Sequence, residues 1–132
     1  MDSETRYDGG TTLYLACHSE HLPIVRWLIE ERNIDVDRTK DNGVTPVWIA
    51  AQENHLKVVK FLVEKADADV KKGDENGATS LLIVADKGHF EVVKFLVEKS
   101  DADIYEGDKN SENLLIVASH HGDDRMAEYL LF

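Results

Sequence analysis

The chain has 132 residues and a formal net charge of −11, with 42% hydrophobic and 31% charged residues. This length and composition predict one soluble domain over residues 1–132. The negative charge argues against nucleic acid as a partner, because it repels a phosphate backbone. No apolar run approaches the roughly 18–20 residues that a membrane span needs, so we expect no membrane association.

The charge and the cysteine content also bear on partner and compartment. A net charge of −11 is compatible with a basic protein partner, attracted over long range, but the ordinary explanation is that the charge keeps an exposed solenoid surface soluble. Cys17 is the only cysteine, and residues 1–6 lack the features of a secretory signal. We therefore expect an intracellular protein, cytoplasmic or nuclear.

A repeat of 34 residues runs through the sequence. Residues 43–51 (GVTPVWIAA) are matched 34 positions later by residues 77–85 (GATSLLIVA), and residues 55–65 (HLKVVKFLVEK) by residues 89–99 (HFEVVKFLVEK). Such a period is typical of a solenoid, which buries its core between neighbouring copies. We place four copies at about residues 7–39, 40–73, 74–107 and 108–132, the last incomplete.

Each copy is predicted to begin with a turn and a short first helix. In the second copy, Gly43 belongs to an Asp-Asn-Gly turn signal. Thr45 suits the N-cap of a helix and Pro46 its first position, where the missing N–H costs nothing. The first helix is predicted to run to about Asn54.

A second helix is predicted from about Leu56 to Lys65. Its apolar residues recur with helical spacing, so they predict one buried stripe along the helix. These residues are Val58, Val59, Leu62 and Val63. The other copies repeat the plan, which predicts an all-α fold without significant sheet.

These motifs resemble the ankyrin repeat. The family pattern Gly-x-Thr-Pro-Leu-His-x-Ala-Ala is similar to residues 43–51, and its Gly-His junction and Val-x-x-Leu-Leu second helix are similar to residues 54–55 and 59–63. The resemblance covers about residues 7–132. It implies an ankyrin-type solenoid of stacked helix-turn-helix units with projecting turns. It also implies a protein-binding scaffold rather than an enzyme.

The departures from the pattern carry predictions of their own. The histidine of the family's Thr-Pro-Leu-His motif is missing from every copy, and Tyr14, Trp48, Leu82 and Ile116 occupy its place. In the family this histidine ties one repeat to the next by hydrogen bonds. We expect apolar packing to replace it here, with Trp48 and Tyr14 serving mainly in packing and secondarily as contacts for a partner. Asn113 replaces the threonine of the fourth copy and can still cap a helix.

The sequence predicts no cofactor and no catalytic or metal site. The histidines His21, His55 and His89 recur with the period, which indicates a structural role at the junction between helices. His120 and His121 are metal-ligand types, but adjacent helical residues point about 100° apart and no further ligand is suitably spaced. Cys17 lies in a slot for small residues and is predicted to be a buried, unreactive thiol.

The resemblance implies that partner contacts come from the turn tips and the concave face of the first helices. Carried over by position, the candidate residues are His18, Ser19, Asp41, Asn42, Val44, Gln52, Glu53, Glu75, Asn76, Ala78, Asp86, Lys87, His120 and His121. The main alternative is a structural spacer, or an excerpt of a longer repeat array with no binding role of its own. The apolar C-terminal edge, ending at Phe132, predicts either further repeats or self-association.

Overall fold

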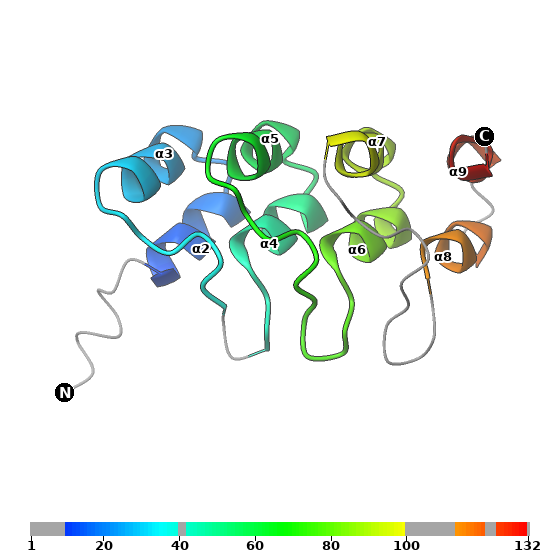
Figure 1. Ribbon diagram of the computed structural model, residues 1–132, viewed down its shortest axis with the longest axis horizontal. Helices are drawn as coiled ribbons and strands as arrows, with labels where there is room; N and C mark the ends of the chain where they lie inside the picture. Colours follow the sequence, from blue (N-terminus) through cyan, green and yellow to red (C-terminus); the bar gives the residue numbers. More distant parts are fainter. Residues whose placement is uncertain (1–9, 40–41, 100–112, 121–123, 132) are drawn as a thin grey trace.

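The computed structural model describes residues 10–39, 42–99, 113–120 and 124–131, and in this part of the chain it contains eight helices and no strand (Figure 1). The helices are α2 (Gly10–His18), α3 (Leu22–Glu30), α4 (Pro46–Gln52), α5 (Leu56–Glu64), α6 (Ser80–Lys87), α7 (Phe90–Lys99), α8 (Leu114–His120) and α9 (Asp124–Leu131). The predicted all-α class is confirmed.

The helices form two layers of a solenoid. The first helices of the repeats, α2, α4, α6 and α8, lie side by side in one row, and the second helices, α3, α5, α7 and α9, lie in a row above them (Figure 1). The segment between α5 and α6 projects as a hairpin from the edge of the first-helix row. This is the stacked arrangement with projecting turns that the repeat predicts.

Side-chain caps fix where the first helices begin. The hydroxyl of Thr45 accepts a hydrogen bond from the backbone N–H of Trp48 (3.2 Å), and Pro46 occupies the first turn. Thr79 caps α6 in the same way (3.3 Å). The side chain of Asn113 accepts a hydrogen bond from the N–H of Ile116 (3.0 Å), so the predicted cap of the fourth copy is confirmed.

A left-handed residue follows the first helices α2, α4 and α6. Glu20, Asn54 and Gly88 occupy the same repeat position and have φ angles of 61°, 63° and 76°. This conformation is easy for glycine, tolerable for asparagine and unfavourable for glutamate. It turns the chain sharply, so that the second helix returns over the first. α4 therefore ends at Gln52, two residues before the predicted end.

The hairpins pack against one another closely enough to require glycine. Gly43 has φ = 82°, and a Cβ atom on it would lie 2.9 Å from the backbone nitrogen of Glu75 in the next hairpin. That same nitrogen donates a hydrogen bond to the carbonyl oxygen of Asn42 (2.9 Å). The backbone contact between successive turns leaves no room for a side chain at residue 43.

The core lies between the two layers and between the repeats. Val58, Val59 and Leu62 are completely buried, as the stripe predicts, but Val63 is only half-buried. Phe61, which the sequence stripe omits, is 8% exposed. The reason is the neighbouring repeat: the guanidinium of Arg26 lies 5.7 Å from the centre of the Phe61 ring and covers it.

Replacement of Leu62 by alanine is expected to cost about 2–5 kcal/mol of unfolding free energy. Loss of this fully buried side chain leaves a cavity in the close-packed interface between neighbouring repeats, which we call the seam. Urea denaturation followed by circular dichroism measures this loss. Lys57→Ala, on the exposed side of the same helix, is the control and should change stability by less than about 0.5 kcal/mol. Equal effects of the two substitutions would contradict the assignment of the buried face.

Ser80→Pro is expected to stabilise the protein by about 1–2 kcal/mol. Ser80 stands where the second copy has Pro46, at the start of the helix, and within the described residues its fully buried hydroxyl forms no hydrogen bond. The preceding Thr79 already has φ = −83° and ψ = 170°, which is compatible with a following proline. Thermal unfolding measures the gain, and Ser80→Ala separates the effect of the hydroxyl from that of the ring. A fall in melting temperature with proline would show that this helix start differs from the second copy.

Candidate partner-binding face

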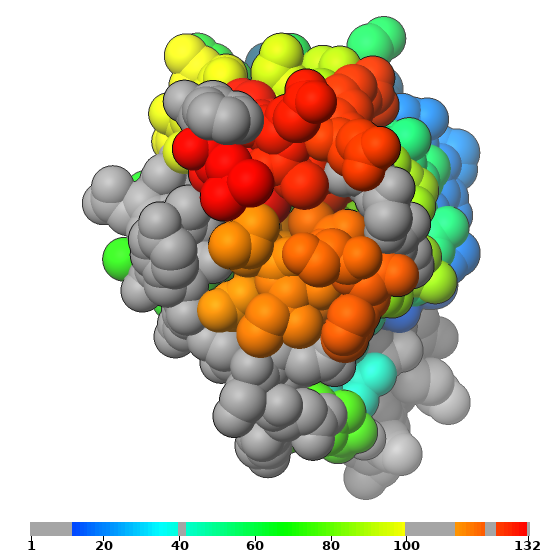
Figure 2. Space-filling model, turned by 90° about the vertical axis from the view of Figure 1, so that its right-hand side faces the viewer, coloured from blue at the N-terminus to red at the C-terminus, as the bar shows by residue number. Residues whose placement is uncertain are grey.

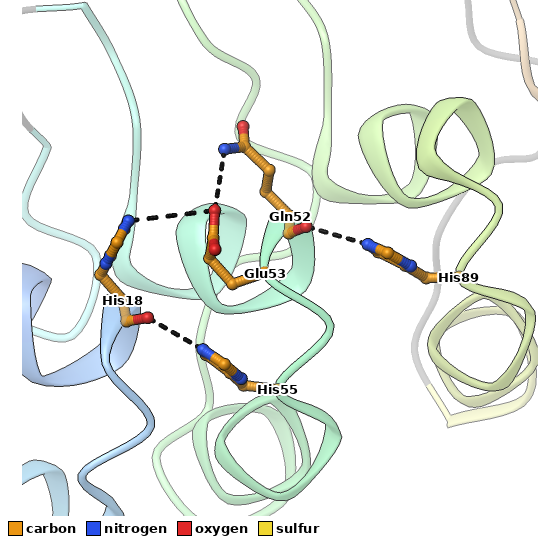
Figure 3. A network of polar contacts seen from close by, with 5 residues as sticks. All are labelled: His18, Gln52, Glu53, His55 and His89. Atoms are coloured by element: carbon orange, nitrogen blue, oxygen red, sulfur yellow. Dashed lines mark hydrogen bonds and ion pairs between the residues drawn. The ribbon is translucent and has the colours of Figure 1, made fainter.

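Two histidines at the helix junctions connect neighbouring repeats by hydrogen bonds (Figure 3). The Nε2 atom of His55 lies 2.8 Å from the carbonyl oxygen of His18, and that of His89 lies 3.0 Å from the carbonyl oxygen of Gln52. A carbonyl oxygen can only accept, so Nε2 carries the hydrogen in both rings. The structural role predicted for these periodic histidines is confirmed for the second and third copies.

The acceptors of these bonds are the last carbonyl groups of α2 and α4. Such groups have no partner within their own helix, so the ring donors of the next repeat satisfy them. The bonds join residues 37 positions apart and cross the seam in the same way at both places. Together they fix how one helix pair is positioned against the next.

A polar cluster surrounds the first of these bonds at the ends of α2 and α4. The Glu53 carboxylate accepts a hydrogen bond from the side-chain amide of Gln52 (3.2 Å), and it lies 3.9 Å from Nε2 of His18 (Figure 3). The Glu20 carboxylate lies 3.7 Å from Nδ1 of His55. Both side chains of the first contact remain accessible, with exposures of 34% at Glu53 and 48% at His18.

Trp48 corrects one prediction of the sequence. Its indole Nε1–H donates a hydrogen bond to the carbonyl oxygen of Ala78 in the following hairpin (2.9 Å). A hydrogen bond between repeats therefore persists at the position of the missing family histidine, where apolar packing alone was expected. The ring itself is 8% exposed and belongs to the core, so Trp48 offers little surface to a partner.

The described candidate residues form two rows at opposite ends of the first helices. The first row is at the helix C-termini and contains His18, Ser19, Gln52, Glu53, Asp86, Lys87 and His120. The second row is in the turns that precede the helices and contains Asn42, Glu75, Asn76 and Ala78. A seven-residue helix such as α4 separates the rows by about 10 Å. An occupant of both rows must therefore span the first-helix layer.

Exposure divides the candidates further. Gln52, Glu53 and Ala78 are half-buried, and the other described members of the two rows are exposed. Val44 is 4% exposed and part of the core, so its side chain offers little surface to a partner, contrary to the exposed turn position that the resemblance implied. Asp41 and His121 lie outside the described residues.

Glu20 is a member of the cluster that the sequence did not single out. The equivalent residues of the next two copies, Asn54 and Gly88, are of the types usually found in the left-handed conformation. A glutamate at this repeat position is unusual, and that departure is the sequence feature that could have identified Glu20. The carboxylate is exposed at the junction beside His55, next to the first row. It adds a third carboxylate to those of Glu53 and Asp86 at this edge.

The described residues include the side-chain types that hold metal ions or act as nucleophiles. No group of three or more His, Cys, Asp or Glu side chains there is arranged to hold a metal ion. Burial raises the pKa of Cys17 to about 12, so the thiol stays protonated and unreactive at neutral pH. Among the helices in the described part of the chain, none combines the length and the apolar character that a membrane span requires.

The family assignment follows from comparison with known proteins. A family model described as ankyrin repeats (3 copies) matches residues 1–74 and again residues 66–132. The chain therefore belongs to the ankyrin repeat family, whose members generally serve as modules for protein–protein interaction and not as catalysts. No match was found among curated proteins.

His55→Ala is expected to reduce the unfolding free energy by about 1 kcal/mol, because it leaves the His18 carbonyl group without its partner in the next repeat. His21→Ala is the matched control. Both histidines precede a second helix without capping it through the side chain, but the exposed His21 has no preceding repeat among the described residues. Denaturation at low protein concentration should show a loss below about 0.5 kcal/mol for the control. Indistinguishable losses would contradict the role of the bond between repeats.

Proposed function

We propose that this protein is a scaffold that binds a protein partner through the first-helix face, which we define as the two rows at the helix C-termini and in the turns. The observation that carries the proposal is the contrast between positions within the repeat. One repeat position is histidine in the first and fourth copies (His18 and His120), Gln52 in the second and Asp86 in the third, so its charge and shape vary along the array. The repeat position that packs the core as Val58 and Val92 is Ile24 in the first copy and Met126 in the fourth, so it is apolar in every copy. A surface that varies on a constant framework suits recognition.

The electrostatics of this face favour a basic partner. The C-termini of α4 and α6 end at this edge, and a helix C-terminus carries a partial negative charge. The carboxylates of Glu20, Glu53 and Asp86 add to it, within a chain of net charge −11. Lys87 and the histidines interrupt the acidic row, so the pattern is mixed in detail and negative overall. A lysine- or arginine-rich segment of a partner fits this arrangement.

The single, buried cysteine suits a reducing compartment, and we propose that the partner is met inside the cell, in the cytoplasm or nucleus. No cofactor takes part in this function. Recognition uses the polar rows, while the core and the bonds between repeats hold those rows in place.

The double variant Glu53→Lys with Asp86→Lys is expected to lose most of the partner binding. It reverses two charges at the ends of neighbouring first helices, and the ion pair and hydrogen bond of Glu53 that it removes are worth less than about 1 kcal/mol of stability. The melting temperature should therefore change little. The wild-type protein and the variant are each immobilised and incubated with a cell lysate. Quantitative mass spectrometry then compares the amounts of lysate proteins that each of them retains.

Glu64→Lys with Glu91→Lys is the matched control. Both residues are exposed on second helices, and each double variant changes the net charge from −11 to −7, two units per substitution. A protein lost by the first variant, retained by the control and released by salt supports the proposal. Equal retention by both variants would show that the first-helix face is not the interface. Complete absence of a retained protein favours a structural spacer.

A further inference from the structure

The N-terminal end of the solenoid exposes an apolar surface that is buried in the following repeats. Leu15 on α2 is 57% exposed, and Ile24 and Trp27 on α3 are 45% and 50% exposed. Their equivalents 34 residues later are Ile49, Val58 and Phe61, with exposures of 3%, 0% and 8%. In the third copy the equivalents are half-buried Ile83 and buried Val92 and Phe95. We call Leu15, Ile24 and Trp27 the front face. At the repeat position of Trp27, Phe61 and Phe95 lie beneath Arg26 and Lys60 of the preceding repeat.

The C-terminal end exposes the complementary half of the same seam. α8 and α9 form the outer surface at this end (Figure 2), and Ile116 and Leu131 on them are 38% and 61% exposed. One repeat earlier the equivalent residues are Leu82, which is 6% exposed, and Val97, which is half-buried. We call Ile116 and Leu131 the back face. The described residues at both ends thus expose apolar side chains at positions that are buried or half-buried in the internal repeats.

Polar groups at the two ends complement each other as well. The junction histidines His55 and His89 donate hydrogen bonds to carbonyl groups 37 residues earlier, in the preceding repeat. His21 is the same residue at the same repeat position, and its side chain is exposed at the front. The position of the acceptors, His18 and Gln52, is occupied in the fourth copy by His120, the last residue of α8. The repeat position of the donor thus lies at one end of the molecule, and the repeat position of the acceptor at the other.

We propose that the protein assembles end to end with further copies of itself, the front face of one molecule packing on the back face of the next. The new interface continues the seams within the chain: Leu15, Ile24 and Trp27 cover the back face, and His21 Nε2 donates to the His120 carbonyl oxygen of the neighbouring copy. Such an interface joins two different surfaces. It therefore builds open chains rather than closed symmetric dimers.

The observations favour a second copy of the chain as the partner of each end. The front face and the back face carry the same apolar and hydrogen-bonding positions that meet in the internal seams. The net charge of −11 on each copy opposes the assembly at low ionic strength. Salt screens this repulsion and leaves the apolar contact intact, so assembly should strengthen as salt rises. Binding of a basic partner by the first-helix face responds to salt in the opposite direction. The salt dependence therefore tests the assembly and the binding of a basic partner independently of each other.

Sedimentation velocity from micromolar to millimolar concentration tests the assembly. The wild-type protein should show a mass that rises continuously with concentration, more steeply in high salt. Ile24→Asp and Leu131→Asp should each weaken the association at least about tenfold, because each places a carboxylate in the apolar contact. Both residues are exposed in the single molecule, so the melting temperature at low concentration should not change. Ile116→Asp serves as a second back-face variant.

Lys57→Gln is the matched control, since it changes the charge by the same one unit at an exposed position on α5, away from both ends. It should assemble like the wild type. His21→Ala should weaken assembly about fivefold, by loss of the donor.

Mixing the two blocked variants gives the decisive result. Ile24→Asp retains a working back face and Leu131→Asp a working front face, so the mixture should form a one-to-one dimer that neither variant forms alone. Dimers of Ile24→Asp alone would reveal a symmetric back-to-back contact and overturn the proposal. A wild-type protein that stays monomeric at every concentration and salt would also overturn it, and would leave the two ends to another repeat or another partner.

Discussion

Burial of apolar side chains between neighbouring repeats is the interaction on which the rest of this structure depends. The described helices are 7 to 10 residues long, below the roughly 12–15 residues at which an isolated helix becomes marginally stable in water. One helix pair has no core of its own: Leu62 and Leu96 lose all exposure because the layers and the adjacent repeats close around them. Stability therefore accumulates along the stack, from one seam to the next.

Hydrogen bonds across the seams are directional, whereas apolar burial is not, so the hydrogen bonds determine the register of one repeat on the next. Apolar contact tolerates small slides of one repeat on another, whereas the bond from His55 to the His18 carbonyl oxygen holds at one register. Trp48 adds a second bond at the other side of the repeat, where its indole N–H reaches Ala78. The donors belong to side chains that also fill space. Register and packing are thus determined by the same residues.

The proposed recognition surface consists of side chains that neither the apolar core nor the hydrogen bonds across the seams require. The seams engage the interior positions and the last helix carbonyl groups, so the side chains of Glu53 and Asp86 at the helix ends are left at the surface. Their substitution changes the surface charge and leaves the seams intact. The ends of the stack are different, because the side chains exposed there, such as Ile24 and Leu131, occupy the positions that build a seam elsewhere.

The sequence by itself determined the repeat, the two helices per copy, the caps at Thr45 and Asn113 and the structural role of the junction histidines. These features depend on contacts within a few residues or recur with the period, so they can be read from one chain. The assignment of the candidate residues to the turns and to the first helices came from the resemblance to the ankyrin repeat. Their exposure did not: Val44 lies in a turn, yet its side chain folds into the core.

Only the tertiary structure decided which atoms meet across a seam. The 30-residue separation of Trp48 and Ala78, the closure of Arg26 over Phe61 and the contact of Gly43 with the next hairpin all depend on how one repeat is placed on another. Local propensity carries no information about that placement, because it is set by close packing over the whole interface. The same reason explains why one repeat position is buried at Val58 and open at Ile24. The residues are alike, and the presence of a neighbouring repeat makes the difference.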